Sequence, residues 1–237
     1  MPSVDLDSDL LNYIVENGFN PGDRLPTIND LKSDAHLGIS ASKIREQLEV
    51  ARALGLVDVR SKVGTHLKDY SFAPAVILSL KFALARDHSL FELFVQLRNH
   101  VVTAFWHEAC TLLRDEDKQI MRDCVLAARE KLSGKRIQIP HEEHRTFHLT
   151  FFKRLENPFV TGLLEAYWDG YDTVRLNSYV DYDYLQSVWN YHESIIEAIC
   201  AGDYDAAQKA FIEHTKLLRY QTHIGKMKRS DISTQFE

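Results

Sequence analysis

The chain has 237 residues, of which 45% are hydrophobic and 26% are charged, so it can bury one sizeable core or divide into a small and a medium domain. Its formal net charge of -6 argues against a protein that coats nucleic acid regardless of sequence, although specific binding depends on local charge. No apolar stretch approaches the roughly 20 residues of a membrane span. The first residues also lack the basic and apolar regions of a signal peptide, so we expect a cytoplasmic protein that does not contact membranes.

The first 69 residues carry the signals of three short helices. Apolar residues at helical spacing predict a first helix that ends at residues 17–18, where Asn is followed by Gly. Thr27 can cap a second helix that runs to about His36. Ser40 can cap a third helix, which Gly55 ends. The second and third helices, joined by a tight turn, predict a helix-turn-helix.

Two short strands follow these helices. Residues 56–59 alternate in polarity as a strand, residues 61–64 form a turn, and residues 65–67 return as a second strand. We therefore expect residues 1–69 to form a winged helix-turn-helix domain.

The rest of the chain has no strand signal. From residue 70 to residue 224, long amphipathic stretches separated by short breaks predict an antiparallel all-helical bundle, with helices near 20 residues each. One such stretch runs from Leu90 to Leu113, and its apolar residues are expected to line one face: Leu90, Phe91, Phe94, Leu97, Val101 and Phe105. Residues 225–237 are expected to form a flexible tail. The fold class is therefore mainly α, with one small hairpin.

Two of the 11 histidines have a spacing that suits a metal site. His144 and His148 lie one turn apart, on one face of a predicted helix. Imidazoles suit zinc, nickel, copper or iron better than magnesium or calcium. The alternative is that these histidines are hydrogen-bonded polar groups of a pocket, because an i,i+4 pair also arises by chance.

The N-terminal segments PGDRLPTINDL (21–31) and LGISASKIREQLEVARALGLVDVRSKVGTHL (37–67) resemble the DNA-binding domain of the GntR family. The resemblance covers roughly residues 8–68 and implies that the third helix enters the major groove while the wing reaches the minor groove. It implies the following DNA-binding residues: Ser40, Ser42, Lys43, Arg45, Lys62, Gly64 and Thr65. The alternative for Arg45 is a surface arginine paired with Glu49.

The C-terminal part, roughly residues 71–223, resembles the FCD effector domain of the FadR-like subfamily. The residues that carry this resemblance are HRTFH (144–148), LENP (155–158), HESIIEAI (192–199) and AFIEH (210–214). It implies a divalent metal, zinc or nickel first, held by His144, His148, His192 and His214. Many members carry aspartate where this chain has His144.

One arginine and several aromatic residues complete the candidate effector site. Arg98 matches an arginine that faces the ligand cavity in several relatives and would hold a carboxylate bidentately. The alternative is a surface arginine near a subunit interface. The aromatic residues are interpreted as core and interface positions rather than a cofactor site: Tyr167, Trp168, Tyr171, Tyr179, Tyr182 and Tyr184.

Together these features predict a ligand-responsive, DNA-binding transcriptional regulator, a repressor released by a small organic acid. We expect a homodimer on a palindromic operator, because one winged helix makes few phosphate contacts. One alternative is a metal-responsive regulator, in which the ion is the signal. The other is a metal-dependent enzyme, but four protein ligands fill a tetrahedral site and no general base is placed beside them, so we expect no enzymatic activity.

Overall fold

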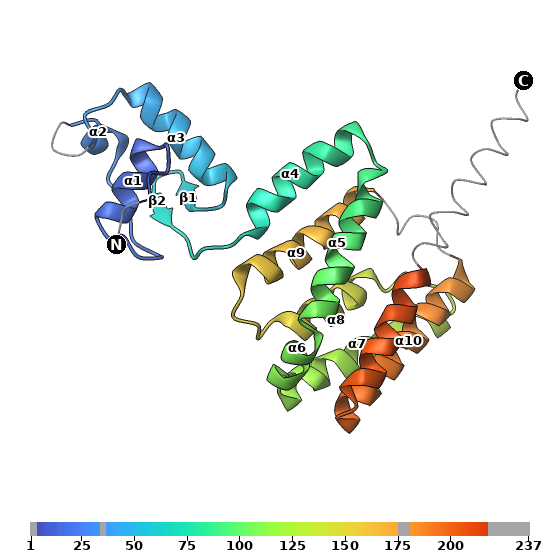
Figure 1. Ribbon diagram of the computed structural model, residues 1–237. Coiled ribbons are helices and arrows are strands. Elements are labelled where there is room, and N and C mark those ends of the chain that lie inside the picture. Colours follow the sequence, from blue (N-terminus) through green and yellow to red (C-terminus); the bar gives the residue numbers. More distant parts are fainter. Residues whose placement is uncertain (1–3, 34–36, 175–180, 218–237) are drawn as a thin grey trace, which may run out of the picture. The chain divides into compact units, whose positions relative to one another are not determined.

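The computed structural model describes residues 4–33, 37–174 and 181–217, and the chain divides into two compact units between Phe82 and Ala83. The expected division at residues 69 and 70 precedes helix α4 (Ala73–Arg86), whereas the observed division falls within that helix. Figure 1 shows the helices and strands of each unit.

The N-terminal unit contains the three helices and the hairpin that the sequence predicts, together with most of α4. The predicted elements are α1 (Asp9–Glu16), α2 (Ile28–Leu31), α3 (Ala41–Ala53), β1 (Val57–Arg60) and β2 (Gly64–Leu67). Each of these three helices begins at a hydroxyl cap: Ser8, Thr27 and Ser40 accept hydrogen bonds from backbone N–H groups of the first turn. Thr27 also forms the predicted reciprocal capping box with Asp30.

Helix α2 ends earlier than expected. The predicted end near His36 lies outside the described residues, but the helix already stops at Leu31. Beyond it, Leu37 N–H donates to the Leu31 carbonyl and Gly38 N–H to the Ser33 carbonyl, with Gly38 in the left-handed region at φ 63°. These two hydrogen bonds lie outside the i,i+4 pattern of an α-helix, so the helix does not continue to Gly38.

The hairpin forms a short wing. Strands β1 and β2 pair antiparallel, with Val57 opposite Leu67 and Arg60 opposite Gly64. The turn between them needs a left-handed backbone, which Lys62 (φ 65°) and Gly64 (φ 110°) adopt. The wing joins a core formed by eight buried residues: Leu10, Ile14, Leu25, Leu31, Ile44, Leu48, Ala51 and Val57.

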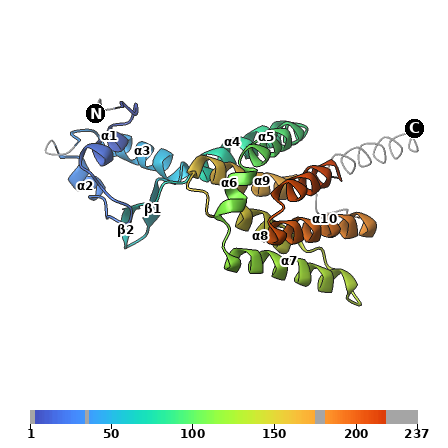
Figure 2. The ribbon, with the colours of Figure 1, turned by 60° about the horizontal axis from the view of Figure 1, so that its bottom comes forward.

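The C-terminal unit is all-helical within the part of the chain that the structure describes. Its helices are α5 (Leu90–Ala104), α6 (Trp106–Leu112), α7 (Asp115–Ser133), α8 (His141–Phe152), α9 (Pro158–Thr173) and α10 (Tyr182–Ala201). A last helical segment covers residues 204–217. Helix α7 packs against α8 and α10, and α5 packs against α9 (Figure 2). No helix among the described residues is both long enough and apolar enough to span a bilayer.

The prediction of a single helix from Leu90 to Leu113 differs from the structure in two respects. The helix breaks at Phe105, because Trp106 turns into the core, where its indole Nε1–H donates to the Tyr204 carbonyl at 3.0 Å. The inward face of α5 is only partly the expected one: Phe91 is buried as expected, but the other buried residues are Val95, Arg98 and Val102. Leu90 and Leu97, expected inside, are exposed. Helix α5 is apolar on two sides, so periodicity alone could not select the buried side.

A buried carboxylate joins the start of α7 to the end of α8. Asp117 is fully buried and accepts hydrogen bonds from Arg154, from Lys153 at 2.8 Å and from the Arg114 backbone N–H at 3.0 Å. Burial alone would raise the pKa of Asp117, but these donors outweigh burial and hold the pKa well below its ordinary value. The network fixes the C-terminal end of α8, the helix that carries His144 and His148.

Candidate functional site

Four histidines meet inside the C-terminal unit. Helix α8 contributes His144 and His148, α10 contributes His192, and the last helical segment contributes His214. One donor atom from each lies within 4.8 Å of all the others. The structure therefore brings together the four residues that the sequence selected as a candidate metal site.

Hydrogen bonds fix the ring orientation of two of these histidines. His192 Nδ1 lies 2.7 Å from the Val188 carbonyl, which assigns the proton to Nδ1 and leaves the Nε2 lone pair free. His192 Nε2 lies 3.0 Å from His148 Nε2. The other histidines contribute buried nitrogens with no hydrogen-bond partner among the described residues, namely His144 Nε2 and His214 Nδ1.

All four rings are neutral at pH 7. Burial lowers the pKa of His144, His148 and His214 well below the usual value, and the neighbouring histidines and Arg98 lower it further. Burial also lowers the pKa of His192, to about 4, although its bond to Val188 opposes this. Neutral imidazoles have a lone pair available for a metal without first losing a proton.

A bound transition-metal ion explains the four histidine side chains better than a metal-free, hydrogen-bonded pocket does. A hydrogen-bonded pocket accounts for His148 and His192 but leaves His144 Nε2 and His214 Nδ1 buried and unpaired, which is costly. The adjoining cavity has a volume of about 20 Å³, room for one water-sized particle. Tetrahedral zinc holds nitrogens about 3.3 Å apart. His148 Nε2 and His192 Nε2 are already 3.0 Å apart, whereas donor atoms nearer the 4.8 Å limit of the cluster would have to move closer. Metal binding stays a prediction.

Arg98 lies beside the histidines and is not a surface residue. Only 5% of it is exposed, and burial lowers the pKa of its guanidinium. Its Nη1 donates to Asn99 Oδ1 at 3.0 Å and its Nη2 faces His148 Nδ1 at 3.4 Å, while Nε has no hydrogen-bond partner. The guanidinium carbon lies 4.7 Å from the Tyr167 ring centroid. No carboxylate pairs with Arg98 among the described residues, so the site contains a buried cation without an anion.

Most of the aromatic residues named from the sequence lie in or near this site. Tyr167, Trp168 and Tyr171 are buried core residues, and with Tyr184 they line the small cavity beside Arg98. Tyr182 is exposed, and Tyr179 lies outside the described residues.

A larger hollow lies elsewhere in the same unit. It is an open groove of about 730 Å³ between α8 and the start of α9, with Leu149, Thr150 and Leu164 among its lining residues. None of the four histidines lines it, and neither does Arg98. The groove has more room than the small cavity but lacks the convergent donors.

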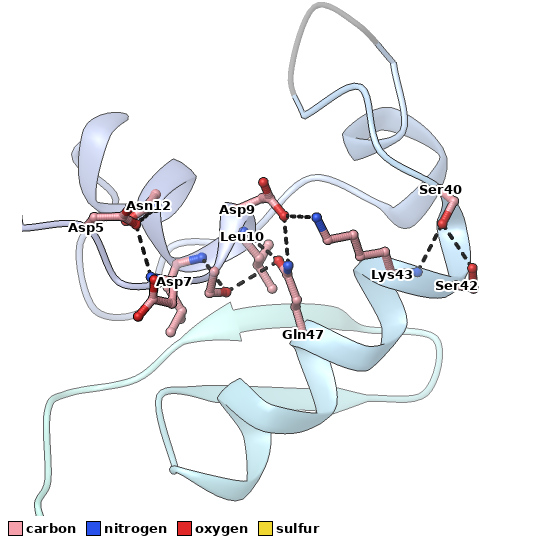
Figure 3. Close-up of polar contacts among 11 residues, drawn as sticks. Asp5, Asp7, Asp9, Leu10, Asn12, Ser40, Ser42, Lys43 and Gln47 are labelled. Carbon is pink, nitrogen blue, oxygen red and sulfur yellow. Dashed lines mark hydrogen bonds and ion pairs between the residues drawn. The ribbon is translucent and has the colours of Figure 1, made fainter.

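The candidate DNA-binding residues of α3 are exposed on its first turns. Ser40 Oγ accepts the Lys43 backbone N–H at 3.3 Å and lies 2.9 Å from Ser42 Oγ (Figure 3). Arg45 is exposed and has no ion-pair partner among the residues described. The alternative pairing of Arg45 with Glu49 does not form, because Glu49 pairs with Arg52 at 2.7 Å instead. Arg45 is therefore available to a ligand.

The wing presents the remaining candidates, Lys62 at its tip with Gly64 and Thr65 on β2. The sequence did not identify Arg24 as a neighbour of the wing. A Cβ added to Gly64 would lie only 2.7 Å from Arg24 Nε, so this arginine lies close to the backbone of the wing. The sequence also did not single out Asp9, which binds Lys43 at 2.7 Å. Both contacts join residues far apart in the sequence, so no local pattern could reveal them.

Comparisons with known proteins agree with this arrangement. Residues 94–217 match the FCD domain. The chain is 23% identical to the Uxu operon transcriptional regulator of Escherichia coli (strain K12), over 90% of this chain and 83% of that one. It is 24% identical to the HTH-type transcriptional regulator LutR of Bacillus subtilis (strain 168), over 85% of this chain and 92% of that one.

A solved structure shows the same fold. The chain resembles Streptococcus agalactiae GntR with a TM-score of 0.61 at 22% identity, covering 89% of this chain and 95% of that chain. The FCD match spans more than half of the chain. The protein therefore belongs to the FadR-like, FCD-containing branch of the GntR family, and it is a transcriptional regulator rather than an enzyme.

Proposed function

We propose that this regulator changes its affinity for an operator when a small organic acid binds at Arg98, with the four histidines holding a divalent metal beside it. The observation that carries the proposal is the buried guanidinium of Arg98, which has no carboxylate partner among the described residues. A buried cation of this kind is costly until an anion pairs with it. A ligand carboxylate supplies that anion and fits the planar donor fork. That the unliganded form represses transcription stays a prediction.

His144, His148, His192 and His214 would hold the metal, with zinc or nickel as first choices. When bound, the ion supplies positive charge that attracts a second carboxylate oxygen. Val188 orients the His192 ring by accepting its Nδ1–H, which leaves Nε2 to bind a metal. Arg98 can only donate toward His148 Nδ1, which puts the His148 proton on Nε2, so His148 would have to turn away from Arg98 or change tautomer to bind through Nε2. His144 in place of the aspartate common in the family removes a negative charge from the ligand set.

A second candidate function, a metal-responsive regulator, is favoured by the size of the cavity. About 20 Å³ accommodates an ion but no organic acid unless side chains move. DNA affinity that depends on added metal, with no response to organic acids, would support this candidate over the first.

The first prediction concerns metal content. His192→Ala should lower the zinc or nickel bound per chain, because three ligands remain to hold the ion. His144→Asp should retain the metal or bind it more tightly, because it adds a charged ligand. Elemental analysis of protein purified without chelator or histidine tag measures both. His107→Ala is the matched control, since His107 is an exposed histidine that pairs with Asp205. Wild-type protein that contains no metal and cannot be loaded with zinc or nickel would rule the site out.

The second prediction concerns Arg98. Arg98→Met replaces an unpaired buried cation with an apolar side chain of similar length, so the acid-free protein should unfold at an equal or higher temperature. The variant should lose the thermal shift that wild-type protein gives with acetate, lactate, succinate or citrate. Arg98→Lys keeps the charge but not the planar fork, and should respond about tenfold more weakly. A shift of equal size in wild type and Arg98→Met would place the acid elsewhere, with the groove between α8 and α9 as the next place to test.

The third prediction concerns association. We propose that two copies pair through the outer face of α5, where Leu90, Leu93 and Leu97 are exposed at helical spacing. Leu93 is 60% exposed, so Leu93→Glu should leave the fold intact and shift light scattering from dimer to monomer. Leu126 on α7 is 62% exposed, and Leu126→Glu is the control that should stay dimeric. Equal behaviour of the two variants would exclude this face.

The fourth prediction concerns the recognition helix. Arg45→Ala should abolish binding to an operator selected from random DNA, because Arg45 is the exposed, unpaired basic side chain near the start of α3. The melting temperature should stay within about 2 °C of wild type, since an exposed side chain contributes little to stability. Arg52→Ala on the same helix is the control and should bind nearly normally. A gel-shift titration at fixed salt in which Arg45→Ala matches wild type would contradict the assignment.

A further inference from the structure

Lys43, a candidate DNA-binding residue, is already occupied by a carboxylate of its own chain. Its Nζ lies 2.7 Å from Asp9 Oδ2, and the two side chains are 52% and 41% exposed. Asp9 is the first residue of α1, whereas Lys43 lies on the first turn of α3. The ion pair therefore joins two helices at the end of α3 that carries Ser40 and Ser42 (Figure 3).

A second side chain from α3 positions Asp9. Gln47 Nε2 donates to the same Asp9 Oδ2 at 2.9 Å, while Gln47 Oε1 accepts the Leu10 backbone N–H at 2.8 Å. Gln47 Oε1 also lies 3.3 Å from the Ser8 hydroxyl. Gln47 is half-buried and one turn from Lys43, so it holds the start of α1 beside the lysine. Hydrogen bonds from Lys43 and Gln47 hold the pKa of Asp9 below its ordinary value, and its carboxylate is charged at neutral pH.

We propose that Asp9 takes the place of a DNA phosphate on Lys43 and thereby limits the affinity of this protein for DNA of any sequence. The inference rests on the DNA-binding role of α3. The Lys43 ammonium cannot form a full ion pair with Asp9 and with a DNA phosphate at the same time. A phosphate must therefore displace the Asp9 carboxylate or share the lysine with it. An exposed ion pair is weak and exchanges readily, which makes Asp9 a competitor rather than a permanent block.

The negative charge of Asp9 also weakens DNA binding directly. A carboxylate on this surface repels the phosphate backbone, in addition to neutralising Lys43. The resulting loss of binding free energy is the same for every DNA sequence, because phosphate contacts carry no sequence information. In a chain with a net charge of -6, Asp9 makes binding depend more on the base contacts of residues such as Arg45.

A purely structural role for Asp9 makes a different prediction. An acidic residue in the first turn stabilises a helix through the macrodipole, and in that case its removal would lower stability without raising DNA affinity. Asp9→Asn removes the charge that both roles use but leaves an amide oxygen that can still accept the Gln47 hydrogen bond. Tighter DNA binding by this variant supports competition for Lys43, whereas lower stability without tighter binding supports the structural role.

The test measures binding of the full-length protein to a mixed-sequence duplex of about 30 base pairs by fluorescence anisotropy, between about 50 and 200 mM salt. Asp9→Asn should bind about two- to fivefold more tightly than wild type, the range expected for an exposed charge pair. The slope of log affinity against log salt should steepen by about 0.9 for each additional phosphate that the protein neutralises. Glu16→Gln removes the same charge from the same helix but frees no cation, and it should change the affinity less.

The decisive comparison uses Lys43→Ala. If Asp9 acts through Lys43, most of the increase in affinity from Asp9→Asn disappears in the Lys43→Ala background. An increase that is equal in Asp9→Asn and Glu16→Gln, or that persists without Lys43, overturns the inference while leaving DNA binding intact. No binding by wild type or any variant at the lowest salt overturns the proposed DNA-binding role itself, and the inference with it.

Discussion

The C-terminal unit is organised around one unpaired charge, the guanidinium of Arg98. Burial without a counter-anion is among the most costly placements for a side chain, and the chain compensates only in part, with Asn99, the Tyr167 ring and a long contact to His148. Burial is the main cause that lowers the pKa of His144 and His148, and the nearby guanidinium lowers it further, so these rings stay neutral. An anion at Arg98 and an ion among the histidines would therefore complete one electrostatic arrangement.

Local signals predicted the starts of α2 and α3 and the end of α3, because a single side chain or glycine sets each of them, whereas the end of α2 at Leu31 was not predicted. Thr27 and Ser40 accept backbone hydrogen bonds as predicted, and Gly55 adopts the left-handed conformation that follows the end of α3. Prediction failed where tertiary packing decides. The break at Phe105 exists because Trp106 reaches the Tyr204 carbonyl, 98 residues away, and no local pattern contains that contact.

The candidate sites show the same division. The spacing of His144 and His148 placed them on one face of a helix, and the structure brings His192 and His214 to them. The burial of Arg98 could have been inferred from its register, because it repeats with Phe91, Val95 and Val102 along α5. A second apolar stripe on α5, with Leu93 and Leu97, obscured that register. The pairing of Asp9 with Lys43 could not have been inferred, since it depends on how α1 packs against α3.

The size of the space beside Arg98 links ligand binding to conformational change. A cavity of about 20 Å³ holds roughly one water molecule, whereas pockets for small organic ligands have volumes of hundreds of cubic ångströms. An acid can reach Arg98 only if lining residues move, such as Tyr171 on α9 or His214 and Thr215 on the last helical segment. An acid that bound there would bind an expanded arrangement better than the compact one, and such a difference in affinity is the condition for a ligand to shift a conformational equilibrium. The residues around Arg98 are packed too closely to admit an acid without moving. Because of this packing, the binding of an acid would be coupled to a conformational change and could act as a signal.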